Sequence, residues 1–192
     1  MPLYARHEEG RLVWGIWQMD ECPDADKRTR EHEAVYRLLE QLCGGPVEVE
    51  HEPSGKPYLK NSTWHVSISH TKGYVAVALH PDCEVGIDIE HYTDRVCRVQ
   101  TKFLSSEELA GVDGENVGQL LVYWCAKEAV YKALNIEGTE LRSHIRVLPF
   151  SYSQTETEGT CTAVELKTGT RKEFPLRYIL AKEFVLTYTL IQ

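Results

Sequence analysis

The sequence of this 192-residue chain contains no long apolar run. No segment approaches the roughly 18 consecutive apolar residues that a membrane helix needs. The N-terminal stretch MPLYARHEEGRL also lacks the apolar region of a secretion signal. These absences argue against membrane insertion and against secretion, and we expect a cytoplasmic protein.

Paired cysteines are missing as well. The cysteines are scattered along the chain, and none belongs to a CxxC pair. They are Cys22, Cys43, Cys83, Cys97, Cys125 and Cys161. This scatter favours reduced thiols over a disulfide framework or a zinc site.

An excess of positive charge is the third absence. The chain has 21 lysine and arginine residues against 29 acidic residues, which gives a formal net charge of -8. Because general nucleic-acid binding depends on a basic surface, nucleic acid is not an expected partner. A polyanionic ligand would need a local basic patch.

What the sequence does contain is a globular composition, with 42% hydrophobic and 26% charged residues. Apolar spacing predicts long helices over residues 24–42 and 116–135, and a shorter helix with a capping box begins at Ser105. Strands are predicted over residues 11–17, 47–51, 64–69, 74–79, 85–90, 145–149, 160–166, 174–178 and 184–191. The pattern predicts an α+β fold in two halves, residues 1–84 and 85–192, each with a small antiparallel sheet and one long helix.

Two carboxylates share one face of the strand predicted at residues 85–90. Side chains alternate along a strand, so Asp88 and Glu90 lie about 7 Å apart on the face opposite the apolar residues. Oxygen ligands at positions i and i+2 can hold one hard cation, and magnesium is the usual choice in phosphate chemistry. The strand pattern alone leaves a second interpretation open, a solvated acidic face on a half-exposed edge strand.

A third carboxylate, Glu128, falls on the apolar stripe of the second long helix. The stripe consists of Val117, Leu121, Trp124, Tyr131 and Asn135. A carboxylate on a core-facing stripe must be paired, protonated or bound to a metal. Glu128 would join Asp88 and Glu90 if their strand packs nearby, or it would form a local i,i+4 ion pair with Lys132.

Basic residues that suit a polyanion occur at three places. Lys27, Arg28 and Arg30 crowd a helix start, where the helix dipole favours anions. Lys56 projects from a turn, and His70 ends a predicted strand. Each has an ordinary interpretation too: a solvated helix turn, a turn lysine without a function, and a histidine that satisfies a turn carbonyl.

Together these segments resemble the 4'-phosphopantetheinyl transferase superfamily. Five motifs carry the resemblance, in the order and approximate spacing of that family: Gly55–Pro57, Ser67–His70, Gly86–Glu90, Lys102–Glu108 and Trp124–Lys132. The long segment before the DxE motif is similar to the larger, surfactin-type group. The resemblance therefore implies a pseudo-dimer of two similar α+β halves in one monomeric chain, with one site between them.

The resemblance also implies roles for individual residues. Asp88, Glu90 and Glu128 would hold Mg²⁺ at the coenzyme A pyrophosphate. Glu128 or a metal-bound water would deprotonate the carrier serine. The implied catalytic set is Glu128, Asp88 and Lys132. The implied coenzyme A contacts are Arg28, Thr29, Lys56, Ser69, His70, Lys127 and Lys132.

The implied reaction is that of a holo-[acyl-carrier-protein] synthase. It moves the 4'-phosphopantetheine moiety of coenzyme A to a serine of an apo acyl or peptidyl carrier protein and releases adenosine 3',5'-bisphosphate. Two other functions stay open: a non-catalytic coenzyme A-binding protein and a metal-dependent pyrophosphohydrolase. The sequence does not specify the carrier; Arg95, Arg98 and Lys102 are candidate docking residues or a solvated helix face.

Overall fold

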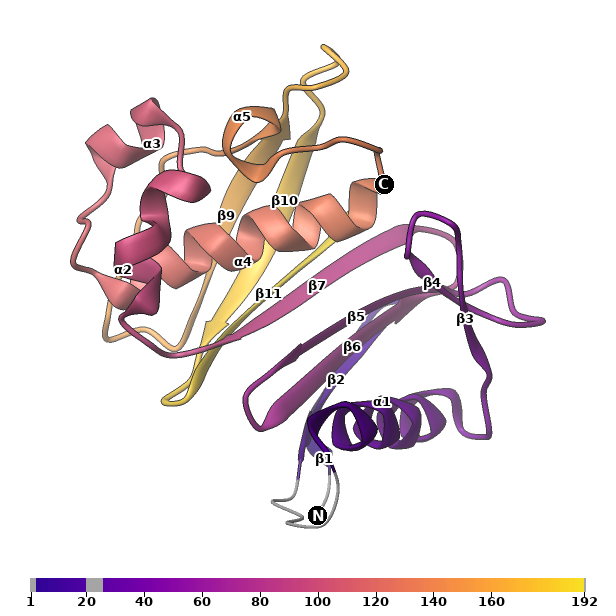
Figure 1. Cartoon of the computed structure of the whole chain (residues 1–192). Coiled ribbons are helices and arrows are strands. Elements are labelled where there is room, and N and C mark those ends of the chain that lie inside the picture. The colour runs from indigo at the N-terminus through magenta and orange to yellow at the C-terminus, as the bar shows by residue number, and fades with distance from the viewer. Residues whose placement is uncertain (1–2, 20–25, 192) are drawn as a thin grey trace.

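The computed structural model describes residues 3–19 and 26–191. Two antiparallel sheets lie side by side, and one long helix packs against each of them (Figure 1). This arrangement confirms the expected mixed class of helices and antiparallel sheets. The further expectation, that the two halves are structural repeats of each other, stays a prediction.

The N-terminal sheet has four strands in the order β1-β2-β6-β5. The strands are β1 (Leu3–Glu9), β2 (Leu12–Gln18), β5 (His65–Thr71) and β6 (Tyr74–His80). A separate two-stranded ribbon, β3 (Val49–His51) and β4 (Pro57–Leu59), lies beside them. In this sheet β5 is an edge strand, because its main chain pairs only with β6 among the described strands.

Helix α1 (Lys27–Cys43) covers the N-terminal sheet. The side chain of Asp26 caps its first turn by accepting from the backbone N–H of Thr29. Gly44 ends the helix in the left-handed conformation, which a residue without Cβ adopts at little cost. The predicted helix included residues 24 and 25, which lie outside the described residues.

The C-terminal sheet has five strands in the order β7-β11-β10-β9-β8. Its strands are β7 (Glu84–His91), β8 (Ile145–Val147), β9 (Glu158–Glu165), β10 (Glu173–Leu180) and β11 (Phe184–Ile191). The helical elements of this half are α2 (Arg95–Val99), the 3₁₀ turn η1 (Gln100–Lys102), α3 (Ser106–Gly111), α4 (Val117–Leu134) and α5 (Leu141–His144). The chain passes from the first sheet to the second between β6 and β7.

Helix α4 lies across the C-terminal sheet and is buried on most of its circumference. Asn116 caps its start through the backbone N–H of Gln119, and Asn135 ends it in the left-handed conformation. Between Leu120 and Val130, only Trp124 and Glu128 are less than fully buried. The least buried stripe of this helix therefore carries Glu128.

Strand β7 joins the two halves through its apolar face. Its Ile87 belongs to a core cluster that also contains Ile16 of β2, Ala76 of β6 and Leu186 of β11. Alternation then directs Asp88 and Glu90 to the opposite face, toward α4. The two sheets are thus held together by a shared apolar core directly beneath the acidic residues.

The structure confirms each strand and long helix that the sequence predicts, to within a few residues at the ends. The capping box at Ser105 is also confirmed, with Glu108 as its reciprocal partner. The sequence interpretation missed five short or peripheral elements: β1, β4, α2, η1 and α5. All five cysteines that the structure describes are free, and Cys22 lies outside the described residues. No helix in the described part of the chain is both long and apolar enough to cross a membrane.

Candidate functional site

Asp88 is the most buried of the three carboxylates, with 3% of its surface exposed. Its Oδ1 atom accepts from the Lys132 ammonium at 2.7 Å and from the Ser69 hydroxyl at 2.7 Å. Its Oδ2 atom is buried and has no hydrogen-bond partner among the described residues. The alternative of a solvated acidic strand face is therefore wrong, and Asp88 retains an unused acceptor.

Glu90 lies two residues further along the same face of β7. Its Oε1 atom accepts from the indole N–H of Trp124 on α4 at 3.2 Å, and Thr71 lies 3.5 Å from its Oε2 atom. Burial raises the pKa of Glu90, and the charge of Asp88 raises it further. The carboxylate is therefore held in place by neutral donors that do not neutralise its charge.

Glu128 does not lie on a core-facing stripe, which corrects the sequence interpretation. Tyr131, on the same stripe, is 42% exposed, whereas other faces of α4 pack into the core of the C-terminal half. Burial raises the pKa of Glu128 to about 7, with the charge of Asp88 as the next cause. Lys132 opposes this shift, but its ammonium bonds to Asp88.

The contact between β7 and α4 that brings these groups together is unusually close. A Cβ atom on Gly86 would lie 1.9 Å from the backbone oxygen of Ala129. Only glycine therefore permits the helix backbone to approach the strand at this point. Because Ala129 follows Glu128 directly, this contact sets how near Glu128 comes to Asp88.

The carboxylate cluster of Asp88, Glu90 and Glu128 has the chemistry of a cation site. No group of three or more His, Cys, Asp or Glu side chains among residues 3–19 and 26–191 is arranged to hold a metal ion as it stands. Two observations nonetheless fit a hard cation: the unpartnered Oδ2 of Asp88, and the raised pKa of both glutamates. A cation would bind the unpartnered Oδ2 atom of Asp88, and its positive charge would lower the pKa of both glutamates.

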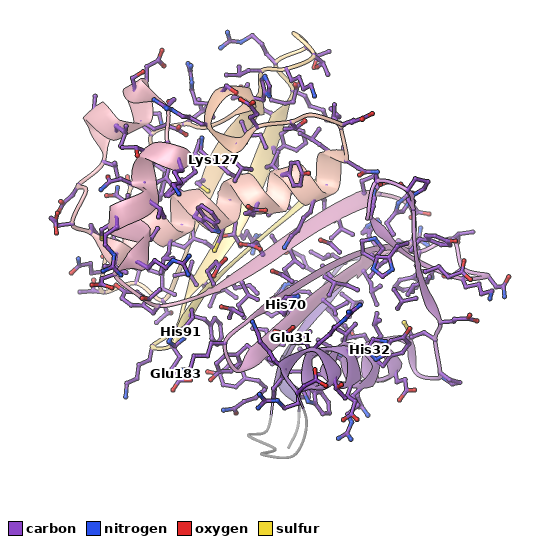
Figure 2. The ribbon with its side chains drawn as sticks, viewed as in Figure 1. Glu31, His32, His70, His91, Lys127 and Glu183 are labelled. Carbon is purple, nitrogen blue, oxygen red and sulfur yellow. The ribbon has the colours of Figure 1, made fainter. Side chains whose placement is uncertain are left out.

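A second group of predicted site residues gathers at the start of α1. His70 Nδ1 lies 3.5 Å from a carboxylate oxygen of Glu31, and the Lys27 ammonium lies 3.4 Å from the same atom. Figure 2 shows His70 and Glu31 close together. Arg28 is exposed, and the Thr29 hydroxyl donates to Asp26 at 2.7 Å. His70 follows Ser69 directly, so β5 connects this basic group to the carboxylate cluster.

Lys56 lies apart from both groups. Its ammonium is mostly buried and pairs with Glu84, at the start of β7. The nearby Glu52 accepts from the side chain of Asn135, at the end of α4, at 3.0 Å. The turn that carries Lys56 therefore contacts the end of α4 and the start of β7. The contact on β7 is at Glu84, four residues before Asp88.

Lys127 is not at this site, contrary to the expectation that it contacts coenzyme A phosphates. Its side chain is fully buried, and its ammonium bonds to Glu108 at 2.8 Å, to Leu141 O at 3.0 Å and to Ile145 O at 2.5 Å. Three acceptors use all three protons of the ammonium. Burial lowers the pKa of Lys127, while the charge of Glu108 opposes this effect. Lys127, labelled in Figure 2, is accordingly a structural residue that ties α3 and α5 to α4.

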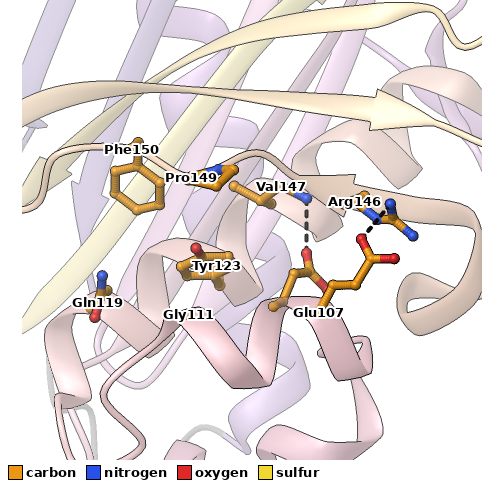
Figure 3. A pocket seen from close by; sticks show the side chains of 9 residues that line it. Glu107, Gly111, Gln119, Tyr123, Arg146, Val147, Pro149 and Phe150 are labelled. Carbon is orange, nitrogen blue, oxygen red and sulfur yellow. Dashed lines mark hydrogen bonds and ion pairs between the residues drawn. The ribbon is translucent and has the colours of Figure 1, made fainter.

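A small pocket lies beside α4 (Figure 3). Its volume is about 140 Å³, and Gln119, Tyr123 and Phe150 are among its lining residues. Gln119 precedes Glu128 by nine residues, which is about half a turn around the helix axis. This pocket is therefore separate from the carboxylate cluster.

Sequence reasoning missed Thr187 altogether. It lies directly opposite Asp88 in the antiparallel pair of β7 and β11, so the two side chains share a face. Its hydroxyl is buried and has no hydrogen-bond partner among the described residues. A threonine in a largely apolar terminal strand, which also contains Thr189, was the available signal, but the residue opposite it in the sheet could not be known.

A family model described as the 4'-phosphopantetheinyl transferase superfamily matches residues 84–189. The match covers more than half of the chain, and the chain therefore belongs to the 4'-phosphopantetheinyl transferase superfamily. Membership makes it a transferase of phosphopantetheine groups, with coenzyme A and a carrier protein as partners in general terms. The match runs from β7 to β11 and so contains Asp88, Glu90 and Glu128. No curated protein matches the chain.

Proposed function

We propose that this chain transfers the 4'-phosphopantetheine moiety of coenzyme A to a serine of an apo acyl or peptidyl carrier protein, with release of adenosine 3',5'-bisphosphate. The observation that carries the proposal is the convergence of Asp88, Glu90 and Glu128 between β7 and α4, inside the superfamily match. We assign the chain to the larger, surfactin-type group, because a helix and a sheet precede the carboxylate strand. An active monomer in the cytoplasm is part of the same proposal.

Asp88, Glu90 and Glu128 are the residues that would hold a magnesium ion. The unpartnered Oδ2 of Asp88 and the mutual charge repulsion of the cluster support this assignment. A set of oxygen ligands suits magnesium better than a softer metal. When bound, the ion supplies positive charge to the pyrophosphate and to the departing phosphate.

The side chains of the cluster can also move a proton and balance charge. Glu128 is the residue that we propose to take the proton of the carrier serine; its pKa is about 7 without metal, and a bound cation would lower that pKa. The serine oxygen then bonds to the β-phosphorus, and the bond from this phosphorus to the bridging oxygen breaks. The electron pair leaves with the bisphosphate. Lys132, which is a quarter exposed beside Asp88, offers a cation to the oxygens that gain charge.

The coenzyme A contacts form the less direct part of the proposal. His70 and Arg28 would bind phosphate groups at the start of α1, with Thr29 on the same turn, and Lys56 would make a further contact. These residues lie outside the superfamily match. Their support is the contact of His70 with α1 through Glu31, which collects basic groups on one edge of the N-terminal half.

One experiment tests the reaction. The protein is incubated with coenzyme A, magnesium and a panel of apo carriers, and the carriers are weighed by mass spectrometry. We expect one carrier to gain the mass of phosphopantetheine, and its serine-to-alanine variant to gain nothing. Coenzyme A bound without turnover would instead indicate a binding protein. Coenzyme A cleaved without any carrier would indicate a pyrophosphohydrolase. Light scattering of the active sample tests the monomer.

A further inference from the structure

Strands β5 and β7 run beside each other at the junction of the two halves (Figure 1). Their main chains do not pair, because β5 pairs only with β6 and β7 only with β11 among the described strands. An edge strand of this kind leaves a row of backbone N–H groups without partners. Buried N–H groups in folded proteins are almost always bonded, so these donors must find acceptors elsewhere.

Side-chain hydroxyls of β5 supply those acceptors. Ser67 accepts from the N–H of Ile87 at 3.1 Å, and Ser69 accepts from the N–H of Ile89 at 3.3 Å. Thr71 accepts from the N–H of His91 at 2.9 Å. Every second residue of one strand thus bonds to every second residue of the other. We call Ser67, Ser69 and Thr71 the hydroxyl ladder.

The rungs of the hydroxyl ladder differ in what they do with their protons. A hydroxyl that accepts from an N–H still has its own proton to donate. Ser69 donates it to Asp88 at 2.7 Å, and Thr71 lies 3.5 Å from Glu90, at the limit of a hydrogen bond. Among the described residues, Ser67 has no hydrogen bond to Asp88 or Glu90. Ser67 and Ser69 are otherwise closely matched, with 3% and 6% of their surfaces exposed.

We propose that Ser69 is a positioning residue for Asp88, and that Thr71 supports Glu90 in the same way. The inference rests on the proposed function of the carboxylate cluster. Ser69 was expected to contact coenzyme A, but its hydroxyl is engaged twice within the protein. Through it, a strand of the N-terminal half orients a carboxylate of the C-terminal half. The cluster is therefore complete only when β5 and β7 are in register.

The test compares Ser69→Ala with Ser67→Ala in the full chain. Each variant leaves one buried N–H of β7 without its acceptor, so both should melt at a lower temperature by a similar amount. Only Ser69→Ala removes the hydroxyl that holds Asp88. Removal of a hydrogen-bond partner behind a metal ligand weakens metal binding by about 10–100-fold. We therefore expect a weaker magnesium affinity of at least about 10-fold in Ser69→Ala, and one close to the parent in Ser67→Ala.

Magnesium affinity is measured by calorimetry on the protein without coenzyme A, and again as the magnesium dependence of carrier modification. Thr71→Val keeps the side-chain shape and should show a smaller loss of magnesium affinity. This variant provides the test if Ser69→Ala does not fold. The positioning role would be overturned if Ser69→Ala and Ser67→Ala had equal magnesium affinities. If only Thr71→Val folds, an unchanged magnesium affinity in that variant would overturn it. Either result would leave the proposed function intact. A parent protein that neither binds magnesium nor modifies a carrier would overturn both.

Discussion

The ammonium of Lys127 and the carboxylate of Glu108 form an ion pair at 2.8 Å with both side chains buried. Glu108 also accepts from the backbone N–H groups of Ser105 and Val147, the second of which is drawn in Figure 3. One ion pair therefore connects α3 and β8 to the helix that carries Glu128. All three protons of the Lys127 ammonium are used within the protein, so it has no donor left for a ligand.

Lys127→Met should destabilise the protein strongly. It leaves the Glu108 charge buried without its partner, and removal of one member of a buried pair typically costs about 3–5 kcal/mol. Urea unfolding measures this difference. The double variant Lys127→Met/Glu108→Gln should lose clearly less than the two single variants together, because no unpaired charge remains. Full stability with a raised KM for coenzyme A would show instead that Lys127 binds the ligand.

Gly86→Ala should separate β7 from α4. The added methyl group would meet the backbone oxygen of Ala129, which cannot rotate away. We expect a loss of about 1–3 kcal/mol of stability, as for other overpacked cores, together with reduced turnover. Gly118→Ala, on α4, is the control, since its methyl group meets the end of the Tyr152 side chain rather than backbone. The two-half site predicts that turnover falls further in Gly86→Ala than in the control.

Glu128→Gln should separate the chemistry from stability. The pKa of Glu128 in the folded protein is about 7, above its ordinary value of 4.5. The folded state thus binds a proton more tightly than the unfolded state. Without metal, stability is highest below the ordinary pKa and is lost as the pH rises toward 7. In chelator at pH 8, Glu128→Gln should therefore be more stable than the parent, by about 2–3 kcal/mol, and at pH 5 nearly equal to it.

The same variant should lower turnover by at least about 100-fold, as expected for the loss of an acid-base group or metal ligand. Urea melts at the two pH values and carrier modification with magnesium give the two measurements. A Glu128→Gln protein that is less stable than the parent at pH 8, and still active, would identify Glu128 as a structural residue.

Carrier modification should depend on magnesium. The oxygen set of Asp88, Glu90 and Glu128 predicts that transfer stops in a chelator and returns when magnesium is added in excess. Calcium at the same concentration is a useful comparison, because it accepts longer bonds and looser geometry. Transfer that continues undiminished after exhaustive chelation is incompatible with the metal assignment.

Lys56→Ala should mainly weaken the binding of coenzyme A. Loss of one charge-assisted hydrogen bond to phosphate would raise KM by an amount equivalent to about 1–3 kcal/mol, with little change in kcat. Lys60→Ala is the matched control, because Lys60 lies on the same segment and also pairs with glutamates, Glu48 and Glu50. If both variants raise KM equally, the loss reflects the overall charge of this segment, and Lys56 makes no specific contact with coenzyme A.

The sequence predicted the elements with strong local signals. The two long helices have apolar spacing and capping residues, and the strands of the C-terminal sheet have clear apolar runs. The missed elements have none of these signals. Strand β1 is polar and lies at a sheet edge, where pairing with β2 rather than its own pattern makes it a strand. The short helices α2 and α5 depend on packing against α4.

The candidate site was predictable in part for the same reason. Asp88 and Glu90 share a face because of strand alternation, which is a local property. Lys127 and Glu128 are neighbours on a helix, but their side chains leave it about 100° apart, and Lys127 is buried against α3 and α5. The role of Ser69 depends on which strand of the second half lies beside β5. That is a tertiary relationship, which no local pattern encodes.

The pairing of β7 also governs the order in which the protein can be built. The main-chain partner of β7 is β11, about 100 residues later in the chain. During synthesis, the strand that carries Asp88 must wait for almost the whole C-terminal half before it can join its sheet. Until then the edge of β7 that pairs with β11 in the folded protein is open to other chains. The C-terminal half should consequently fold late, and nascent chains that stall before β11 should be targets for chaperones.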